Sequence, residues 1–355
     1  MHRKNGNPNF QNGNAQPKPQ CNFDIQGAPG SSGGPGNSGG KRKATFNVPP
    51  GQVNRASRMK LCDSGQGIQD IQGGPLLARD KTFKVAHSTP FGNVGGQPLE
   101  SWVGEADDGS SLSFVVDERG HSTASYVNMP ENTITDIYTD ANGNLQSVTK
   151  SGNDYPDEAD PEDTEDMEMT APGEDGLGRR LGLRGLMPDH QQSHRHLSED
   201  GTRLDVLVLW TAKAECRRSN LSAGCTRTAS TKANIEATID LAITETNAGY
   251  SLSGVNTELR LVHSELTPYV EAGSNAFSVA LNDLKGTSDG QMDYVHALRT
   301  QKGADFVALI IDDSQYCGIA KLGPSIDNMF SVTAWNCATG YYSFGHGKHT
   351  NFACL

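Results

Sequence analysis

The residues best suited to chemistry are two histidines near the end of the sequence, His346 and His349. Residues three apart share one face of a helix, so both imidazoles can face one metal ion. A hydrolytic zinc helix instead spaces its histidines four apart and places a general-base Glu directly after the first. Aligned on His346, the base position holds Gly347 and the second ligand position holds Thr350. The pattern therefore predicts weak Zn²⁺ binding by His346 and His349, without a catalytic base.

The residues before this pair alternate between strand and helix patterns. Short apolar runs predict buried strands over 204–210, 259–262 and 306–311. Apolar side chains at helical spacing predict helices over 231–248, 277–284 and 292–298. Strands that alternate with helices favour an α/β fold, with a twisted and mostly parallel sheet joined by crossover helices.

One more strand is predicted shortly before the histidines, over residues 329–335. Its apolar residues alternate with more polar ones, in the order Phe330, Ser331, Val332, Thr333, Ala334 and Trp335. Alternation with a period of two is typical of a strand that is covered on one side only. We therefore expect residues 330–335 to form the antiparallel edge strand of the sheet.

Several short segments occur in an order that resembles a known family. They are Asp205–Thr211, Ala233–Asp240, Thr246–Ser251, Leu259–Val262, Ala304–Ile311, Tyr316–Ala320 and Phe330–Trp335, followed by Phe344–His346. Together, residues 204–346 resemble the reprolysin-like branch of the metzincin zinc peptidases, and most closely the peptidyl-aspartate metalloendopeptidases. The resemblance implies the upper subdomain of a metzincin as the fold of this region.

The resemblance also implies a function. It points to a zinc metalloendopeptidase that hydrolyses peptide bonds in protein or peptide substrates, with Zn²⁺ as its cofactor. In that family zinc lowers the pKa of a bound water to about 7 and polarises the scissile carbonyl. The family's edge strand lines the cleft and pairs with extended substrate. Substrate-binding roles are therefore expected for Phe330, Ser331, Val332, Thr333, Ala334 and Trp335.

The chain departs from the family at the metal site. Gly347 and Thr350 stand at the base and second ligand positions, and the sequence stops at Leu355, one residue before the third ligand. We expect no peptidase activity from residues 1–355. Two alternatives stay open: a non-catalytic relative that still binds extended peptide, or a C-terminus that departs from the natural one through a frame or splice error.

The first part of the chain has a different composition. Residues 1–56 are rich in Gly, Asn, Pro and Gln and are expected to be a disordered tail. Residues 57–152 form a β-rich region, with strand patterns at 102–104, 112–116, 124–127, 133–138 and 145–148. This small region resembles the propeptide that precedes such peptidases; a β-domain of unrelated purpose is the alternative.

A linker is expected over residues 153–200, followed by the truncated catalytic domain over 201–355. Residues 154–175 hold eleven acidic residues and no Lys, Arg or His, so they repel one another and favour an extended chain. The dibasic pair Arg179–Arg180 follows. At a domain boundary this pair predicts cleavage after Arg180 by a processing protease, as in a zymogen.

Charge and hydropathy limit the partners. The formal net charge is −12, and the acidic run of 154–175 accounts for eleven of these charges, which leaves −1. No basic stripe with interleaved aromatic residues is present, so nucleic-acid binding is not expected. No apolar run reaches the ~18 residues that a membrane span requires.

The seven cysteines bear on the compartment. Cys216 and Cys225 flank a short loop, whereas Cys317, Cys337 and Cys354 lie near the proposed cleft. Their arrangement is consistent with disulfides in an oxidising compartment, or with buried free thiols. Family and cysteines favour a secreted protein, although the polar N-terminus lacks the apolar stretch of a signal peptide.

Overall fold

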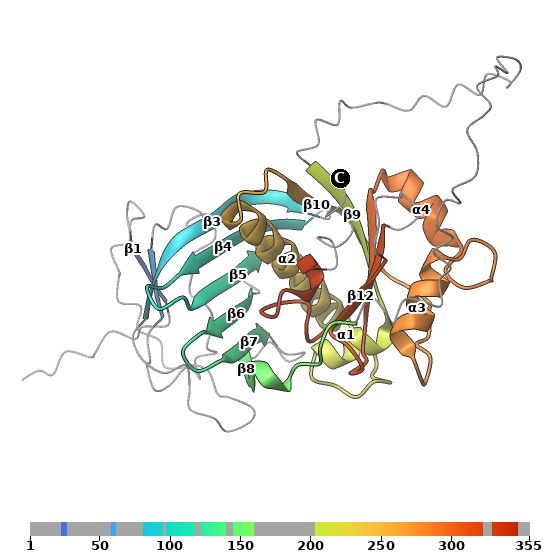
Figure 1. The fold of residues 1–355 in the computed structure, drawn as a ribbon, viewed down its shortest axis with the longest axis horizontal. Coiled ribbons are helices and arrows are strands. Elements are labelled where there is room, and N and C mark those ends of the chain that lie inside the picture. The colour runs from blue at the N-terminus through green and yellow to red at the C-terminus, as the bar shows by residue number, and fades with distance from the viewer. Residues whose placement is uncertain are drawn as a thin grey trace, which may run out of the picture.

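A computed structural model describes eight stretches of the chain: residues 23–26, 58–61, 81–94, 97–117, 122–139, 145–159, 203–321 and 329–346. They form two β-sheets with one long helix between them (Figure 1). The expected Gly-rich tail lies outside the described residues, apart from the strand over residues 23–26. Most of the expected acidic linker, with Arg179 and Arg180, also lies outside them.

The first sheet, here called the N-terminal sheet, is an antiparallel meander in which each strand pairs with the next. Its strands are β1 (Phe23–Gln26), β2 (Arg58–Leu61), β3 (Lys81–Val94), β4 (Gln97–Glu105), β5 (Ser111–Asp117), β6 (Ser122–Asn128), β7 (Thr133–Thr139) and β8 (Leu145–Ser151). The five predicted strand segments all fall within β4 to β8, which confirms a β-rich first region. The short 3-10 helix η2 (Gly152–Asp154) ends it.

The second sheet has the strand order β10-β9-β11-β13-β12. Its strands are β9 (Arg203–Trp210), β10 (Glu258–Leu266), β11 (Phe306–Ile311), β12 (Gly318–Ala320) and β13 (Phe330–Ala334). The first four strands in this order, β10, β9, β11 and β13, run parallel to one another, and β12 pairs with β13 antiparallel. The predicted α/β fold, mostly parallel with an antiparallel edge strand, is therefore confirmed.

The helices follow the predicted periodicity. They are α1 (Ala212–Arg218), α2 (Ala229–Leu252), α3 (Ala276–Lys285) and α4 (Tyr294–Lys302). The Thr228 side chain caps α2 by accepting a hydrogen bond from the Thr231 backbone N–H, which is otherwise unpaired at a helix start. The short helix α1 was not expected from the sequence.

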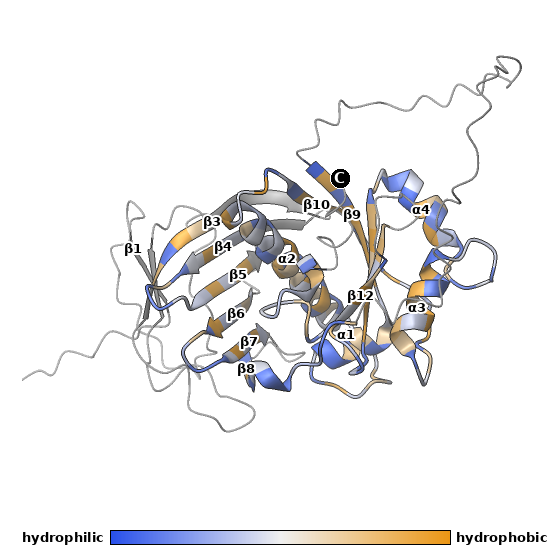
Figure 2. Ribbon diagram, viewed as in Figure 1, coloured by the Kyte–Doolittle hydropathy of each residue, from blue (hydrophilic) through white to orange (hydrophobic). Residues whose placement is uncertain are grey.

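The apolar residues of β9 alternate between two clusters. Leu207 and Leu209 face α3 and α4, whereas Val206, Val208 and Trp210 belong to the cluster on the α2 side. Both faces of a parallel sheet are usually covered by helices, so its strands are apolar on both sides and show no alternation with polar residues. Hydrophobic residues accordingly gather along the second sheet and its helices (Figure 2).

The expected position of the edge strand was wrong. Residues 330–334 form β13, which runs parallel to β11 and is paired on both sides; the antiparallel edge strand is β12. Ser331 and Thr333 are each only 1% exposed. Their small hydroxyl side chains fit inside the protein. The apolar–polar alternation over residues 330–335, which is typical of a half-exposed strand, therefore occurs here in a fully buried strand.

Candidate peptide-binding edge and the interface around it

The outer edge of β12 is the part of the second sheet that can bind another strand. β12 pairs with β13 through Gly318, Ile319 and Ala320, and its other side has no strand partner among the described strands. Unpaired backbone N–H and C=O groups at such an edge bind extended peptide by adding it to the sheet. This edge is the strongest candidate for a functional surface in the described part of the chain.

A disulfide fixes the start of this edge strand. Cys317 is bonded to Cys337, with 5.3 Å between their Cα atoms, which ties β12 to the turn after β13. The Ala334 backbone N–H also donates to the Cys317 carbonyl, over 2.9 Å. A second disulfide, Cys216–Cys225, closes the loop after α1. Both cysteine groups noted in the sequence therefore contain a bonded pair, while Cys354 lies outside the described residues.

The segment after η2 lies along the β12 edge. The Cys317 backbone N–H donates to the Asp157 carbonyl over 2.9 Å, and the Ala159 N–H donates to the Gly318 carbonyl over 3.0 Å. The Tyr155 ring stacks on Tyr341, with centroids 5.0 Å apart and planes inclined by 9°. Tyr155 and Ala159 also pack against the apolar cluster on the α3–α4 side of the sheet.

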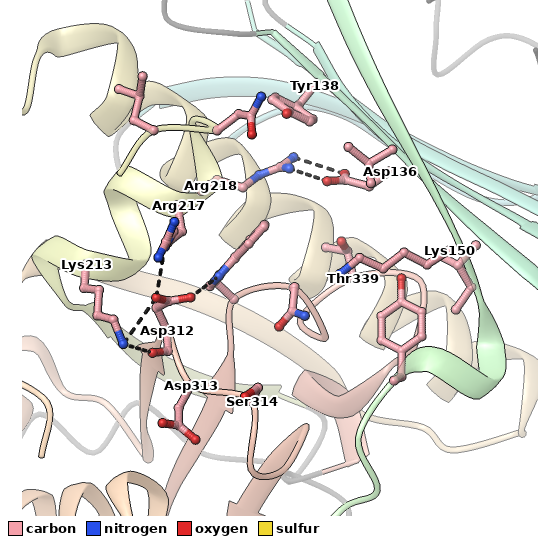
Figure 3. A pocket seen from close by; sticks show the side chains of 17 residues that line it. Asp136, Tyr138, Lys150, Lys213, Arg217, Arg218, Asp312, Asp313, Ser314 and Thr339 are labelled. Carbon is pink, nitrogen blue, oxygen red and sulfur yellow. Dashed lines mark hydrogen bonds and ion pairs between the residues drawn. The ribbon is translucent and has the colours of Figure 1, made fainter. Parts of the chain in front are cut away.

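Beside this segment, the two sheets enclose a cavity of about 530 Å³. Several of its charged side chains are paired with one another: Lys213 and Arg217 with Asp312, and Arg218 with Asp136 (Figure 3). Asp312 accepts a hydrogen bond from the Trp335 indole N–H over 2.8 Å and pairs with Lys213 and Arg217, each over 3.3 Å. Asp312 is therefore neutralised by its neighbours, which gives it a structural role in the wall of the cavity.

An ion pair crosses the same cavity between the two sheets. The guanidinium of Arg218, at the end of α1, bonds to both carboxylate oxygens of Asp136 on β7. Its Nε also donates to Thr238 of α2, and the guanidinium lies 4.5 Å from the ring centroid of Tyr138. Arg218 is only 1% exposed, so these contacts replace the water that the charge would otherwise require.

A buried carboxylate joins α2 to the N-terminal sheet. Glu245 accepts hydrogen bonds from the Ser113 hydroxyl on β5 and from the Gly340 backbone N–H, the latter over 2.7 Å. The pKa of Glu245 is raised to about 7: burial is the largest cause, the Ser113 and Gly340 donors oppose it, and the nearby Asp136 carboxylate adds to it. The contact therefore changes charge close to neutral pH.

The face of the N-terminal sheet that carries these contacts mixes polar side chains with apolar ones such as Val103 and Val148. Residues paired across antiparallel strands lie on one face, and Ser113 pairs with Ser125, which in turn pairs with Asp136. The opposite face is apolar: Trp102 pairs with Phe114, and their rings stack with centroids 5.7 Å apart. The sheet thus turns its hydroxyl- and carboxylate-bearing face toward α2.

The predicted metal ligands are only partly described. His346 is an exposed residue in a short helical turn over residues 343–346, and its N–H donates to the Tyr342 carbonyl over 2.9 Å. His349, Gly347 and Thr350 lie outside the described residues. Among the residues that the structure does describe, no three His, Cys, Asp or Glu side chains form a metal-binding group. The described residues therefore do not fit a complete zinc site.

The predicted substrate-binding residues are not where a substrate could pair with them. Phe330, Val332 and Ala334 are buried in the apolar cluster under α3, and Trp335 is held by Asp312. Because β13 is already paired with β11 and β12, its backbone cannot add a further strand. On this side of the sheet, the described strand with an unpaired side is the next one outward, β12, which has three residues and for which the sequence pattern gave no signal.

Comparison with known proteins gives a partial similarity. A peptidyl-Asp metalloendopeptidase of Stenotrophomonas maltophilia strain K279a is 42% identical over 114 residues, which are 32% of this chain and 27% of the relative. The corresponding protein of Xanthomonas campestris pv. campestris is 39% identical over 114 residues, with the same coverage. The match thus spans about a quarter of the length of these curated relatives.

The remaining similarities are weak. No protein-family model matches the chain. A chain from the solved structure of a chaperone–substrate complex aligns with 42% of this chain and with 23% of its own length. The sequence identity is 15% and the TM-score is 0.31, which is too low to carry an argument. No helix in the described stretches has the length and apolar character to cross a membrane.

Proposed function

We propose that this chain is a relative of secreted zinc metalloendopeptidases, in precursor form, and that extended peptide binds along the outer edge of β12. The observation that carries the proposal is the 42% identity over 114 residues to a peptidyl-Asp metalloendopeptidase. The antiparallel edge strand supports it, because such an edge binds a substrate backbone without regard to most side chains. The two disulfides support an oxidising, extracellular location.

The metal would be bound by His346 and His349, and Gly347 leaves no carboxylate next to the first ligand. A general base contributes about 10²–10⁴ in rate, so its absence removes most hydrolysis even where zinc binds. We propose that residues 1–355 bind zinc weakly, in the micromolar range or above, and cleave no peptide bond at a detectable rate.

An activity assay with a matched restoration tests this proposal. The chain is incubated with zinc and casein, with a chelator as control, and zinc binding is measured by calorimetry. A second chain carries Gly347→Glu and Thr350→His, with a third His supplied beyond Leu355; we expect all three changes to be required together. Chelator-sensitive cleavage by the unchanged chain would refute its inactivity, and no zinc binding by the restored chain would count against the family assignment.

The precursor proposal has its own test. We propose that the N-terminal sheet is a propeptide and that a processing protease cuts after Arg180, so the mature protein begins at Leu181. N-terminal sequencing of secreted material decides this: a first residue inside 204–346, or an uncut chain, contradicts it.

A second candidate function is peptide binding without catalysis. It is favoured by the β12 edge, which already bonds to a peptide segment in the described structure without help from a metal. In this case the restored chain would bind extended peptides as the unchanged chain does, and neither would cleave them.

A further inference from the structure

We propose that residues Tyr155–Ala159, here called the strap, are an intramolecular occupant of the β12 edge that blocks this edge against other peptides. The inference rests on the proposed function in one respect: that the β12 edge is where an extended peptide would bind. It adds the identity of the blocking element, which is this short segment after η2 and not the N-terminal sheet itself.

Two backbone hydrogen bonds join the strap to the start of the β12 edge, at Gly318 and at Cys317 directly before it, although the strap itself is not a regular strand. Asp157 accepts from Cys317, and Ala159 donates to Gly318, so two strap residues two positions apart use the same backbone edge. Alternate residues of an extended chain point their backbone groups to the same side, which is the spacing observed. Because 157 lies by 317 and 159 by 318, the strap runs in the same direction as this part of the chain.

Side chains at both ends hold the strap in place. At its start, the Tyr155 ring is stacked on Tyr341, and the Lys150 ammonium lies 5.5 Å from the ring centroid. Burial, followed by the nearby Asp136 carboxylate, raises the pKa of the Tyr155 hydroxyl. At its end, Ala159 packs against the apolar cluster of the second sheet. The strap is therefore docked by packing as well as by two hydrogen bonds.

Gly318 provides the space for the centre of the strap. A Cβ atom at this position would lie 2.8 Å from the Glu158 carboxylate Oε2 and 3.4 Å from the Val332 carbonyl oxygen. The missing side chain lets Glu158 lie directly against the edge strand. Another extended peptide would need the same space, so it and the strap exclude each other.

The strap has a large advantage over a free peptide. It is covalently linked to η2 and β8, so its effective concentration at the edge is on the order of mM. A free peptide of similar affinity must exceed that concentration to displace it. The edge consequently opens only when the strap is cut away or its anchors are lost.

Hydrogen exchange at the Cys317 amide tests the proposal on the full chain. In the unchanged protein this amide should exchange slowly, because the Asp157 carbonyl covers it. In the double variant Tyr155→Ala/Ala159→Pro, which loses the ring and one N–H donor, its protection should fall about tenfold or more. The matched control, Tyr155→Phe/Ala159→Gly, keeps both the ring and the N–H and should stay close to the unchanged protein.

A binding measurement completes the test. A fluorescent peptide with the sequence of residues 153–161 should bind the double variant at least about tenfold more tightly than it binds the unchanged chain. The same peptide N-methylated at the position of Ala159 lacks the donor and should bind the variant more weakly. An unprotected Cys317 amide in the unchanged protein would refute the proposal that the strap blocks the β12 edge. Equal peptide binding by the unchanged protein and the double variant would refute it as well.

These readouts do not depend on peptidase activity. The strap peptide could bind the double variant while unrelated extended peptides fail to compete with it. This result would refute general peptide binding at the β12 edge and support the strap as its occupant. If the Cys317 amide is unprotected while unrelated peptides bind the edge, the strap fails and the proposed function remains.

Discussion

Helix α2 is buried on two sides, and these two sides differ in chemistry. Toward the second sheet it presents Ile235, Ile239 and Ile243, which belong to one apolar cluster with the strands. Toward the N-terminal sheet it presents Glu245, and Thr238 on α2 binds the guanidinium that reaches Asp136. The stabilisation from apolar burial does not change with pH, whereas the stabilisation from buried titratable groups does. We therefore expect the contacts between α2 and the N-terminal sheet to weaken with pH before those between α2 and the second sheet do.

This difference fits our proposal that the N-terminal sheet is a propeptide. The face of the N-terminal sheet toward α2 carries Ser101, Ser113, Thr123 and Ser125, all buried while the sheets are in contact. Hydroxyl groups are readily hydrated, which lowers the cost of separating this face from α2. Separation exposes apolar surface as well, because the same face also carries the buried apolar residues Val103, Val115, Ile134 and Tyr138. An apolar interface of the same extent would resist separation more strongly and would aggregate once exposed.

The largest effect is expected from the apolar side of α2. Ile239→Ala removes a fully buried side chain and leaves a cavity between α2 and the second sheet. The free energy of unfolding should fall by about 2–5 kcal/mol. Urea denaturation followed by circular dichroism measures this loss. Val270→Ala, at a site that is 83% exposed, is the control and should change the stability very little.

A pH-dependent effect is expected from the polar side. The pKa of Glu245 is raised to about 7 while the sheets are in contact, and contact with water would return it to its ordinary value near 4.5. A raised carboxyl pKa stabilises the docked state fully below pH 4.5, and this stabilisation is lost as pH rises through 7. The change should amount to at most about 3 kcal/mol between pH 4.5 and pH 8.

Glu245→Gln separates this effect from other titrations. The two donors bind different carboxylate oxygens, so in the variant the amide oxygen can accept from the Gly340 N–H while the amide N–H donates to the Ser113 hydroxyl oxygen, and the side chain carries no charge. The variant should lose the share of the pH dependence of stability that Glu245 contributes between pH 5 and 8, and keep the share that other raised carboxyl groups contribute. Asp240→Asn is the comparison, because burial and the nearby Glu236 also raise the pKa of Asp240. An unchanged slope in Glu245→Gln would contradict the assignment.

A smaller effect is expected from the ion pair that crosses the cavity. Asp136→Ala leaves the guanidinium of Arg218 buried without its carboxylate, although Thr238 and Tyr138 remain in contact. Because Asp136 is 24% exposed, the loss should be about 2 kcal/mol, less than for a fully buried pair. Asp205→Ala breaks the pair with Arg260, whose side chain is 47% exposed and remains hydrated without its partner, so the substitution should cost at most about 1 kcal/mol. Equal losses in both variants would contradict a structural role for Asp136.

The sequence predicted β4 to β8 of the N-terminal sheet and β9, β10, β11 and β13 of the second sheet because their patterns are local, whereas it gave no strand for β1, β2 or β3. β9, β11 and α2 each contain a run or a periodicity that is legible within a few residues. β12 has only three residues, and its pairing with β13 and the Cys317–Cys337 bond define it. The apolar–polar alternation over residues 330–335 therefore pointed to the wrong edge strand.

The contacts between the sheets were also beyond the reach of sequence patterns. Ser113 and Glu245 are 132 residues apart, and Asp136 and Arg218 are 82 apart. Their partners are set by how the two sheets meet across α2, and no local spacing records that. The chemistry of the candidate metal residues, in contrast, could be assessed from the sequence alone, because Gly347 and Thr350 occupy positions that a motif defines.

The most direct test of the two-sided account of α2 is to follow the separation of the sheets and the unfolding of the second sheet in one urea titration. Spin labels at Met129→Cys and Val270→Cys, both exposed sites, report the distance between the two parts once Cys21, Cys62 and Cys354 are changed to Ser. Circular dichroism of the same samples reports unfolding.

At pH 8 the distance distribution should broaden to longer distances at a lower urea concentration than the one that unfolds the second sheet. At pH 5 the separation should move to higher urea, and Glu245→Gln should reduce this shift. Separation that coincides with unfolding at both pH values would show that the N-terminal sheet and the second sheet form one cooperative unit, which contradicts the account.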